Sequence, residues 1–166
     1  MKLFHGSDTV VRGPLANVAR AKVDFGQGFY LTKLRGQAES WAKTIASRGR
    51  NRKAFLNVYE FDTAAARRDL GQRYKVFDTY DIPWLDYVVD CRAGGNLQNQ
   101  YDVVEGGVSN DNVIDTVEDY ENGRITAEQA LGQLAYKKVN HQICISAQVV
   151  IDIYLRHVES VELKGA

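Results

Sequence analysis

Hydrophobic and polar positions follow two periods along this chain, one typical of helices and one typical of strands. Over residues 36–47, Ala38, Trp41, Ala42 and Ile45 recur at helical spacing, while residues 54–61 alternate as a half-buried strand does. Read this way, the chain is predicted to form strands at 2–5, 28–32, 54–61, 74–77, 101–104, 142–145 and 158–163, and helices at 36–47, 63–70, 82–91, 112–121 and 127–137. Short strands mixed with helices, without regular strand–helix–strand alternation, favour an α+β fold.

Turn-forming residues support these boundaries. Asn122-Gly123 separates the last two predicted helices, and Thr126 followed by Gln129 has the spacing of a capping box. Residues 8–24 are expected to be irregular. No repeat and no proline- or serine-rich linker interrupts the chain, so we expect a single domain over residues 1–166, with a helical hairpin inserted at about 112–137.

Composition narrows the class of protein. A chain of 166 residues with 45% hydrophobic content can bury one core. Val149–Leu155 is the most apolar run, but it is short and contains Asp152, so no membrane association is expected. No secretory signal follows Met1, and a cytoplasmic location is expected. The two cysteines lie far apart and predict reduced thiols, with a disulfide as the alternative. The three histidines lack metal-ligand spacing, so no metal site is expected.

The net charge of zero hides an asymmetry between the two halves of the chain. Residues 1–77 contain 15 Lys and Arg against 6 Asp and Glu, a balance of +9, whereas residues 78–166 contain 6 against 15, a balance of −9. Two surfaces that neutralise each other within one domain would produce this pattern. A cationic half that attracts a phosphate-bearing ligand would also produce it.

Two glycine-containing motifs point to a ligand. Asp24–Thr32 places two glycines one residue apart before an aromatic, strand-forming run, and Phe4-His5-Gly6-Ser7 ends the first predicted strand. A dinucleotide-binding Rossmann loop would require a third glycine where Leu31 stands, followed by a helix. A Rossmann site is therefore excluded.

Together these motifs resemble the ADP-ribosyltransferase superfamily of the diphtheria-toxin and poly(ADP-ribose)-polymerase type. Three segments are also similar to a family of small bacterial proteins first catalogued as a domain of unknown function: Asp24–Thr32 with Trp41-Ala42, Tyr101–Asp111 and Asn140–Ile145. The resemblance implies a split β-sheet core with flanking helices and NAD as co-substrate. It also implies transfer of ADP-ribose to an intracellular macromolecule, protein or nucleic acid, by a toxin paired with an antitoxin.

The same resemblance assigns NAD-binding roles to six residues. His5 would bond a ribose hydroxyl, the Gly6 backbone would bind the nicotinamide amide, and Tyr30 and Trp41 would stack on the nicotinamide. Ser7 and Gly28 belong to the same two motifs. Tyr30 and Trp41 have the alternative of being ordinary core aromatics, and His5 of being a satisfied polar residue.

The third motif departs from the best-known pattern of the superfamily. Gln142 occupies the position where a glutamate stabilises the cationic transition state, and glutamine carries no charge. Asp111 and Glu105 are the candidates to supply the missing carboxylate. Asp111 is alternatively a helix N-cap, and Glu105 a solvated turn residue.

Other functions stay open. An NAD glycohydrolase, a catalytically silent NAD or ADP-ribose-binding domain and an RNA 2′-phosphotransferase are the alternatives. The basic run 48–53 is interpreted as a solvated helix end rather than a nucleic-acid site, because no aromatic residue is interleaved with it.

Overall fold

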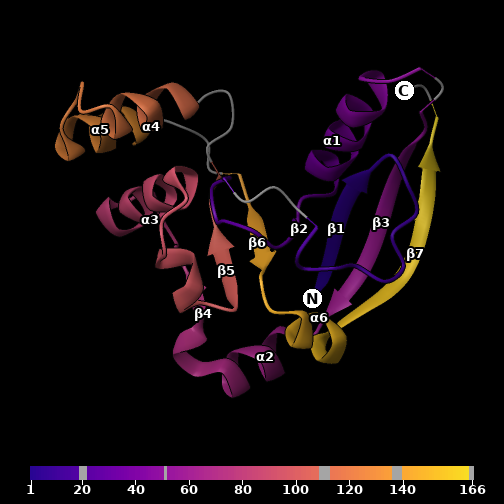
Figure 1. Ribbon diagram of the computed structural model, residues 1–166. Helices are drawn as coiled ribbons and strands as arrows, with labels where there is room; N and C mark the ends of the chain where they lie inside the picture. The colour runs from indigo at the N-terminus through magenta and orange to yellow at the C-terminus, as the bar shows by residue number, and fades with distance from the viewer. Residues whose placement is uncertain (19–21, 51, 109–112, 136–139, 165–166) are drawn as a thin grey trace.

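The structure is a computed structural model that describes residues 1–18, 22–50, 52–108, 113–135 and 140–164. Its strands are β1 (Lys2–Ser7), β2 (Phe29–Leu31), β3 (Ala54–Phe61), β4 (Tyr74–Val76), β5 (Val103–Gly106), β6 (Gln142–Ile145) and β7 (Leu155–Leu163). Its helices are α1 (Arg35–Ser47), α2 (Thr63–Leu70), α3 (Ile82–Ala93), α4 (Ile114–Glu121), α5 (Ala127–Leu134) and α6 (Gln148–Tyr154), with 3₁₀ turns η1 (Gly71–Arg73) and η2 (Leu97–Gln100). The predicted α+β class is confirmed (Figure 1).

The strands form two sheets. Three antiparallel strands have the order β1-β3-β7, and four strands have the order β2-β6-β5-β4, with β4 and β5 parallel. Within the described residues, one isolated antiparallel bridge between Phe4 and Thr32 joins the two sheets. Because β1 and β2 pair nowhere else, the two sheets separate on one side of this bridge.

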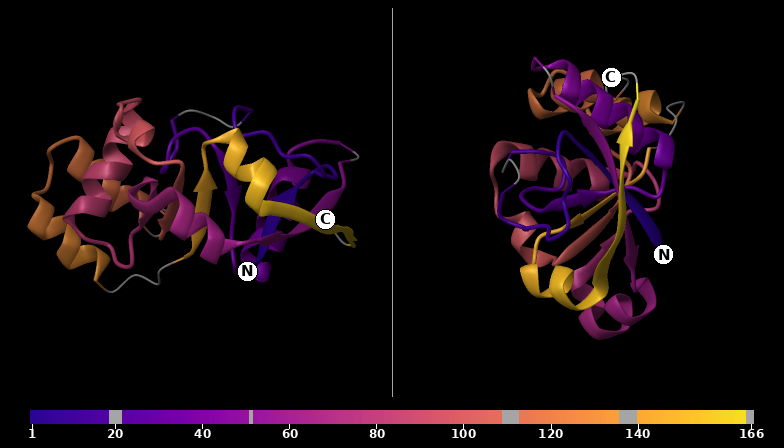
Figure 2. Two further views of the ribbon diagram at one scale, coloured as in Figure 1. Left: turned by 90° about the horizontal axis from the view of Figure 1, so that it is seen from below. Right: turned by 90° about the vertical axis from the view of Figure 1, so that its right-hand side faces the viewer.

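Helices cover these sheets in groups. α1 packs through Ala38 against Phe4, Leu56 and Val58 of the three-stranded sheet. α3, α4 and α5 lie at the opposite side of the molecule, and α2 and α6 lie together at the lower end in Figure 1. Seen from below in Figure 2 (left), the α3–α5 group and the three-stranded sheet lie at opposite ends of the molecule. The end of β2 and the start of β6 therefore lie between α1 on one side and the α3–α5 group on the other (Figure 1).

A buried asparagine holds the outer strands and the following loop to β1. Asn57 of β3 has no exposed surface; its Oδ1 accepts from the Val11 amide and the Ser160 hydroxyl, and its Nδ2 donates to the Ser7 hydroxyl and the Thr9 carbonyl. Every polar atom of this side chain is satisfied, which a buried amide requires. The end of β1 is thereby fixed from behind.

Several predicted boundaries moved. α6 was not predicted. Val150 and Ile151 of its apolar run are buried, and Gln148 fixes its start by bonding the backbone of Pro14 and Ala16, which are distant in sequence. β5 begins two residues later than expected. The N–H of Asp102 bonds the carbonyl of Arg73 instead of extending the ladder. The predicted limits at 112 and 137 lie outside the described residues.

The hairpin of α4 and α5 has the expected chemistry. Thr126 and Gln129 form the predicted capping box, with bonds in both directions. Gly123 at the turn has a φ of 68°, a conformation that glycine adopts without strain.

Both cysteines are buried free thiols, as expected. No helix among the described residues has the length and apolar character needed to cross a membrane.

The charge asymmetry of the chain is partly resolved in this fold. Among the described residues, basic residues of the first half pair with acidic residues of the second in three ion pairs, Lys53–Glu162, Arg67–Glu105 and Arg73–Asp102. The two halves therefore neutralise each other in part. Lys33 and Arg48, near the two ends of α1, form no ion pair with any described residue, and they are taken up below.

Candidate functional site

The split between β1 and β2 is where the sequence motifs meet. The Phe4 N–H donates to the Thr32 carbonyl at 2.8 Å, and the Phe4 carbonyl accepts from the Thr32 N–H at 2.9 Å. One residue further along β1, the strands no longer pair, and His5 Nδ1 donates to the carbonyl of Tyr30 at 2.8 Å instead. Burial lowers the pKa of His5, and this hydrogen bond opposes the shift only in part, so the ring is neutral at pH 7 with Nε2 as an acceptor.

Gly6 presents its backbone to this split. Because backbone groups alternate in direction along a strand, the N–H and C=O of Gly6 point to the same side as those of Phe4, where β2 has no partner for them. A Cβ on Gly6 would lie 2.0 Å from the Ala38 carbonyl oxygen and 2.8 Å from the Ala42 nitrogen. Glycine is therefore required here by the close approach of α1.

We expect Gly6→Ala to destabilise the protein by on the order of 3 kcal/mol, because the backbone of a packed helix cannot move aside cheaply. Gly36→Ala, in the exposed first turn of α1, is the matched control, since an added Cβ there meets nothing within 4 Å. That control is expected to be neutral or to stabilise by up to about 1 kcal/mol. Urea unfolding of both variants measures the difference. Equal stability of the two variants would contradict the packing of α1 on β1.

Tyr30 lines the split from the side of β2. Its hydroxyl donates to the Gly26 carbonyl at 2.6 Å and accepts from the Phe25 N–H at 3.1 Å, so the phenol is fixed to the preceding loop. Burial raises the pKa of Tyr30 well above its usual value. Gly28 also has a packing role, because a Cβ there would lie 2.4 Å from the sulfur of Cys144.

Gln142 lies on the same sheet face as Tyr30. Tyr30 is opposite Cys144, and Gln142 is two residues from Cys144 on β6, so all three side chains leave the sheet on one face. Phe4 and Thr32 are paired at the bridge, so this face continues into the face of β1 that bears Phe4 and Gly6. The side chain of Gln142 is half-buried and bonds no other residue that the structure describes.

Glu105 has a different environment. Its carboxylate, only 9% exposed, accepts hydrogen bonds from Arg67 at 2.9 Å, Tyr74 at 3.0 Å and His141 Nε2 at 3.0 Å. The Nδ1 of His141 accepts from the N–H of Lys33, which leaves the ring hydrogen on Nε2 for Glu105. Burial alone would raise the pKa of Glu105, but the three donors together outweigh it and lower the pKa to about 2.

This network lies on the wrong face to serve Gln142. Glu105 is opposite Ile143 and Gln142 is opposite Gly106, so the two side chains point to opposite faces of the four-stranded sheet. The placement corrects both expectations for Glu105, since it is neither a solvated turn residue nor a carboxylate beside Gln142. Asp111, the other candidate, lies outside the described residues.

Two more predicted site residues have particular places. Ser7 donates its hydroxyl to Thr9 and accepts from Asn57, so it secures the loop after β1 instead of facing the split. Trp41 is 51% exposed on α1 and is not a core aromatic. The guanidinium of Arg48 lies over its ring, 5.4 Å from the centroid. No aromatic residue is interleaved with the basic run 48–53 in sequence, but the fold places Trp41 beside Arg48, the first residue of that run.

Sequence reasoning missed several residues that build the site. His141, Arg67 and Tyr74 form the Glu105 network, and Gln37 bonds both the N–H and the C=O of His141. These contacts hold the start of β6, and hence Gln142, against α1. Gln37 and His141 are 104 residues apart, and no local sequence pattern predicts a contact between residues so distant.

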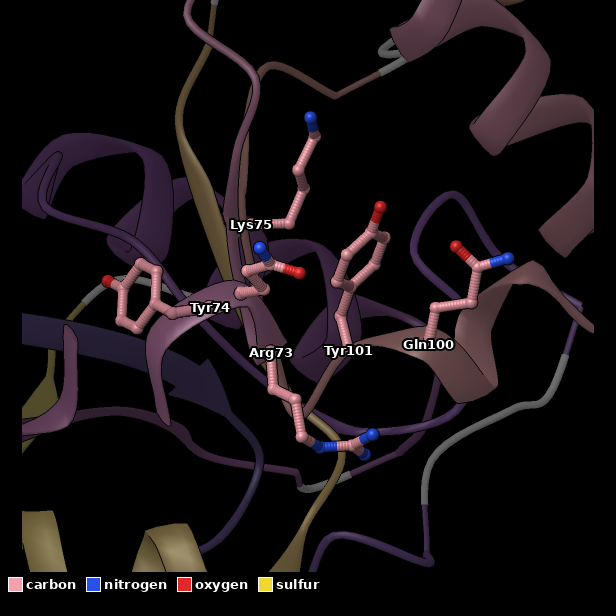
Figure 3. Close-up of a pocket in the computed structure, with 6 residues that line it drawn as sticks. Arg73, Tyr74, Lys75, Gln100 and Tyr101 are labelled. Atoms are coloured by element: carbon pink, nitrogen blue, oxygen red, sulfur yellow. The ribbon is translucent and has the colours of Figure 1, made fainter. Parts of the chain in front are cut away.

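Two hollows on the surface lie elsewhere. One has a volume of about 550 Å³ and is lined by Gln72, Arg73, Tyr74, Lys75, Gln100 and Tyr101; Figure 3 shows these side chains. A smaller one of about 270 Å³ shares Arg73 and Tyr101 with it and reaches Ser146, at the far end of β6 from Gln142. Arg73 is already engaged by both oxygens of Asp102, at 2.6 Å each. These hollows are open and contain none of the predicted site residues.

Comparison with known proteins identifies a family. No curated protein and no solved structure matches this chain. The model of one protein family matches residues 1–156, which is most of the chain. That family has no assigned function, so the resemblance to ADP-ribosyltransferases stays a prediction. The chain belongs to the family described as "Protein of unknown function (DUF3990)".

Proposed function

We propose that this protein is an ADP-ribosyltransferase that binds NAD in the split between β1 and β2. The observation that carries the proposal is the backbone of Gly6, whose N–H and C=O point into the split. Tyr30 and Gln142 lie on one face of the sheets at this split, and His5 lies on the other, where its ring packs against Phe29. The joining of two sheets by one bridge at this point supports an ADP-ribosyltransferase-like split sheet.

The chemistry of NAD fits these groups. The Gly6 N–H donates to the nicotinamide amide oxygen, and the Gly6 C=O accepts from the amide nitrogen. The exposed part of the Tyr30 ring stacks on the pyridinium. His5 Nε2 accepts from a ribose hydroxyl, and the Gln142 amide holds the 2′-hydroxyl as the glycosidic bond breaks. The bonding electrons leave with nicotinamide, and the positive charge passes to the ribose, as in glycoside hydrolysis.

A toxin function inside the producing cell, held in check by an antitoxin, accords with this chemistry. Uncontrolled transfer of ADP-ribose to a macromolecule consumes NAD and modifies its acceptor. An NAD glycohydrolase would use the same groups, with water as the acceptor.

One observation favours a second candidate, a domain that binds NAD or ADP-ribose without cleaving it. Glu105 is turned to the opposite face of the sheet and Asp111 lies outside the described residues, so neither carboxylate candidate is placed beside Gln142. The developing ribose cation would then lack its usual counter-charge. Binding and cleavage must therefore be measured separately.

NAD binding is tested by thermal shift and by titration calorimetry. A ligand at 100 times its Kd stabilises the folded state by about 2.7 kcal/mol, so millimolar NAD is expected to raise the Tm by several degrees. His5→Ala is expected to weaken the shift. His157→Ala is the matched control, because His157 bonds Ser160 on β7 and lies away from the split.

Nicotinamide release and transfer of labelled ADP-ribose onto cell lysate then separate the candidates. Release with transfer supports the transferase, and release without transfer supports the glycohydrolase. Binding without release supports the silent domain. The absence of any Tm shift and of any heat with either NAD or ADP-ribose would contradict the proposed site.

A further inference from the structure

One side of α1, together with its C-cap Arg48, carries a row of polar and aromatic side chains that are exposed except for the half-buried Gln37. Gln37, Trp41, Thr44 and Arg48 are spaced by four, three and four residues, which places them on one side of the helix. The exposed Lys33 precedes α1, and both Lys33 and Gln37 bond His141. We call these five residues the α1 stripe.

The α1 stripe begins at the proposed site. Gln37 Nε2 donates to the His141 carbonyl at 3.2 Å, and Gln37 Oε1 accepts from the His141 N–H at 3.4 Å. Lys33 N–H donates to the ring of the same histidine. Since Gln142 follows His141 directly, a molecule lying along the stripe has one end beside Gln142. From Gln37 to Arg48 the stripe extends about 16 Å, at about 1.5 Å per residue.

Trp41 is an exposed flat surface in the middle of the stripe. It is 51% exposed, whereas the only other tryptophan, Trp84, is fully buried. Arg48 lies over one face of the Trp41 ring, 5.4 Å from its centroid, and this cation–π contact orients the indole while about half of the residue stays exposed. A tryptophan held open at the surface is available for stacking.

The stripe also carries uncompensated positive charge. Residues 33–53 contain seven Lys and Arg against the single acid Glu39. Arg35, Arg52 and Lys53 are paired with Glu39, Asp8 and Glu162. Lys33 and Arg48 form no ion pair with any residue in the described part of the chain. A cation therefore lies near each end of the stripe, with an exposed aromatic ring between them.

We infer that a single-stranded nucleic acid binds along the α1 stripe and is the acceptor of ADP-ribose. A base stacks on Trp41, phosphates contact Lys33 and Arg48, and the neighbouring nucleotide reaches Gln142. Aromatic stacking combined with a cationic path is how proteins bind single strands. A duplex hides the faces of its bases, and an acidic peptide would leave the indole without a stacking partner. As an acceptor site, the stripe rests on the proposed function.

Binding is measured without NAD. Single-stranded RNA and DNA dodecamers of mixed sequence are titrated at low and at physiological salt, with tryptophan emission as the readout. Because Trp84 is buried, quenching reports on Trp41. Quenching is expected, with an affinity that falls as salt rises. In fluorescence anisotropy with labelled dodecamers, Trp41→Ala is expected to weaken binding by roughly tenfold or more.

Charge variants locate the surface. Arg48→Glu and Lys33→Glu are expected to weaken binding and to lower its salt dependence. Lys43→Glu is the matched control, since it makes the same charge change on the far side of α1 and is expected to have a much smaller effect. In the presence of NAD, labelled ADP-ribose is expected to appear on the oligonucleotide, and Arg48→Glu to abolish most of this labelling.

Several results would overturn this inference. One is that neither oligonucleotide quenches the tryptophan emission, and another is that polyglutamate quenches it equally. The others are that a duplex binds as tightly as the single strands, or that Lys43→Glu loses as much affinity as Arg48→Glu. The NAD thermal shift, measured without oligonucleotide, keeps the two proposals apart. If the wild-type protein shows the NAD thermal shift but does not bind single strands, and Arg48→Glu shows the same thermal shift, the stripe is rejected and the NAD site is retained. Single-strand binding without any NAD shift would reject the NAD site and the acceptor role together.

Discussion

Replacing Gln142 by alanine is expected to slow nicotinamide release by about a hundredfold, because a directed hydrogen bond to the ribose is lost in the transition state at a cost on the order of 3 kcal/mol. Glu105 cannot replace the lost hydrogen bond to the ribose, since its carboxylate points to the other face of the sheet. NAD binding, measured by thermal shift, is expected to fall much less than the rate.

Two further variants sharpen this prediction. Gln142→Glu restores a carboxylate beside the developing cation and is expected to preserve or raise the rate of nicotinamide release. Gln100→Ala is the matched control, because Gln100 belongs to η2 and lines the hollow in Figure 3, which contains none of the predicted site residues. Full activity of Gln142→Ala would show that the motif is wrongly placed. Loss of activity in Gln100→Ala would move the site to the hollow.

Glu105→Ala is expected to lower the free energy of unfolding at pH 7 by on the order of 3 kcal/mol, because it leaves Arg67, Tyr74 and His141 without their common acceptor. The same magnitude follows from the pKa of Glu105, which is about 2 in the folded protein against a usual 4.5. Urea unfolding measures it. Glu60→Gln is the control, since the Glu60–Arg156 pair is exposed and its loss is expected to cost less than about 1 kcal/mol.

The pH dependence has a definite sign. A carboxyl group whose pKa is lowered by folding contributes its full stabilisation above its unfolded pKa. It loses that stabilisation as pH falls through its folded pKa. The difference between the wild type and Glu105→Ala is therefore expected to be constant from pH 7 to about 5 and to shrink between pH 4.5 and 2. A difference that stays constant down to pH 2 would mean that packing, rather than charge, accounts for the loss.

The Glu105 network also bears on the proposed site. His141 bonds Glu105 through its ring and Gln37 through its backbone, so a buried ionic group and α1 together fix the residue before Gln142. Glu105 thus belongs to the support of the site, on the face opposite to the one where its carboxylate was expected to act.

Local patterns determined much of the fold. The residues of β3, α2 and β6 were predicted with the limits that the structure has, and so was the capping box of α5. In each, the periodicity, the cap or the turn lies within a few residues of the element that it specifies. α6 was missed because its burial depends on distant segments that its own sequence does not contain.

By itself, the sequence determined the α+β class, most of the elements and the motifs that contain His5, Gly6, Tyr30 and Gln142. Only the tertiary structure decided how these residues relate, because strand register sets the face on which each side chain lies, and register depends on pairing between distant segments. A shift of one residue on β6 would exchange Gln142 for His141 at the site. The same dependence separated Glu105 from Gln142, joined His5 to Tyr30, and left Trp41 and Arg48 exposed together on the α1 stripe.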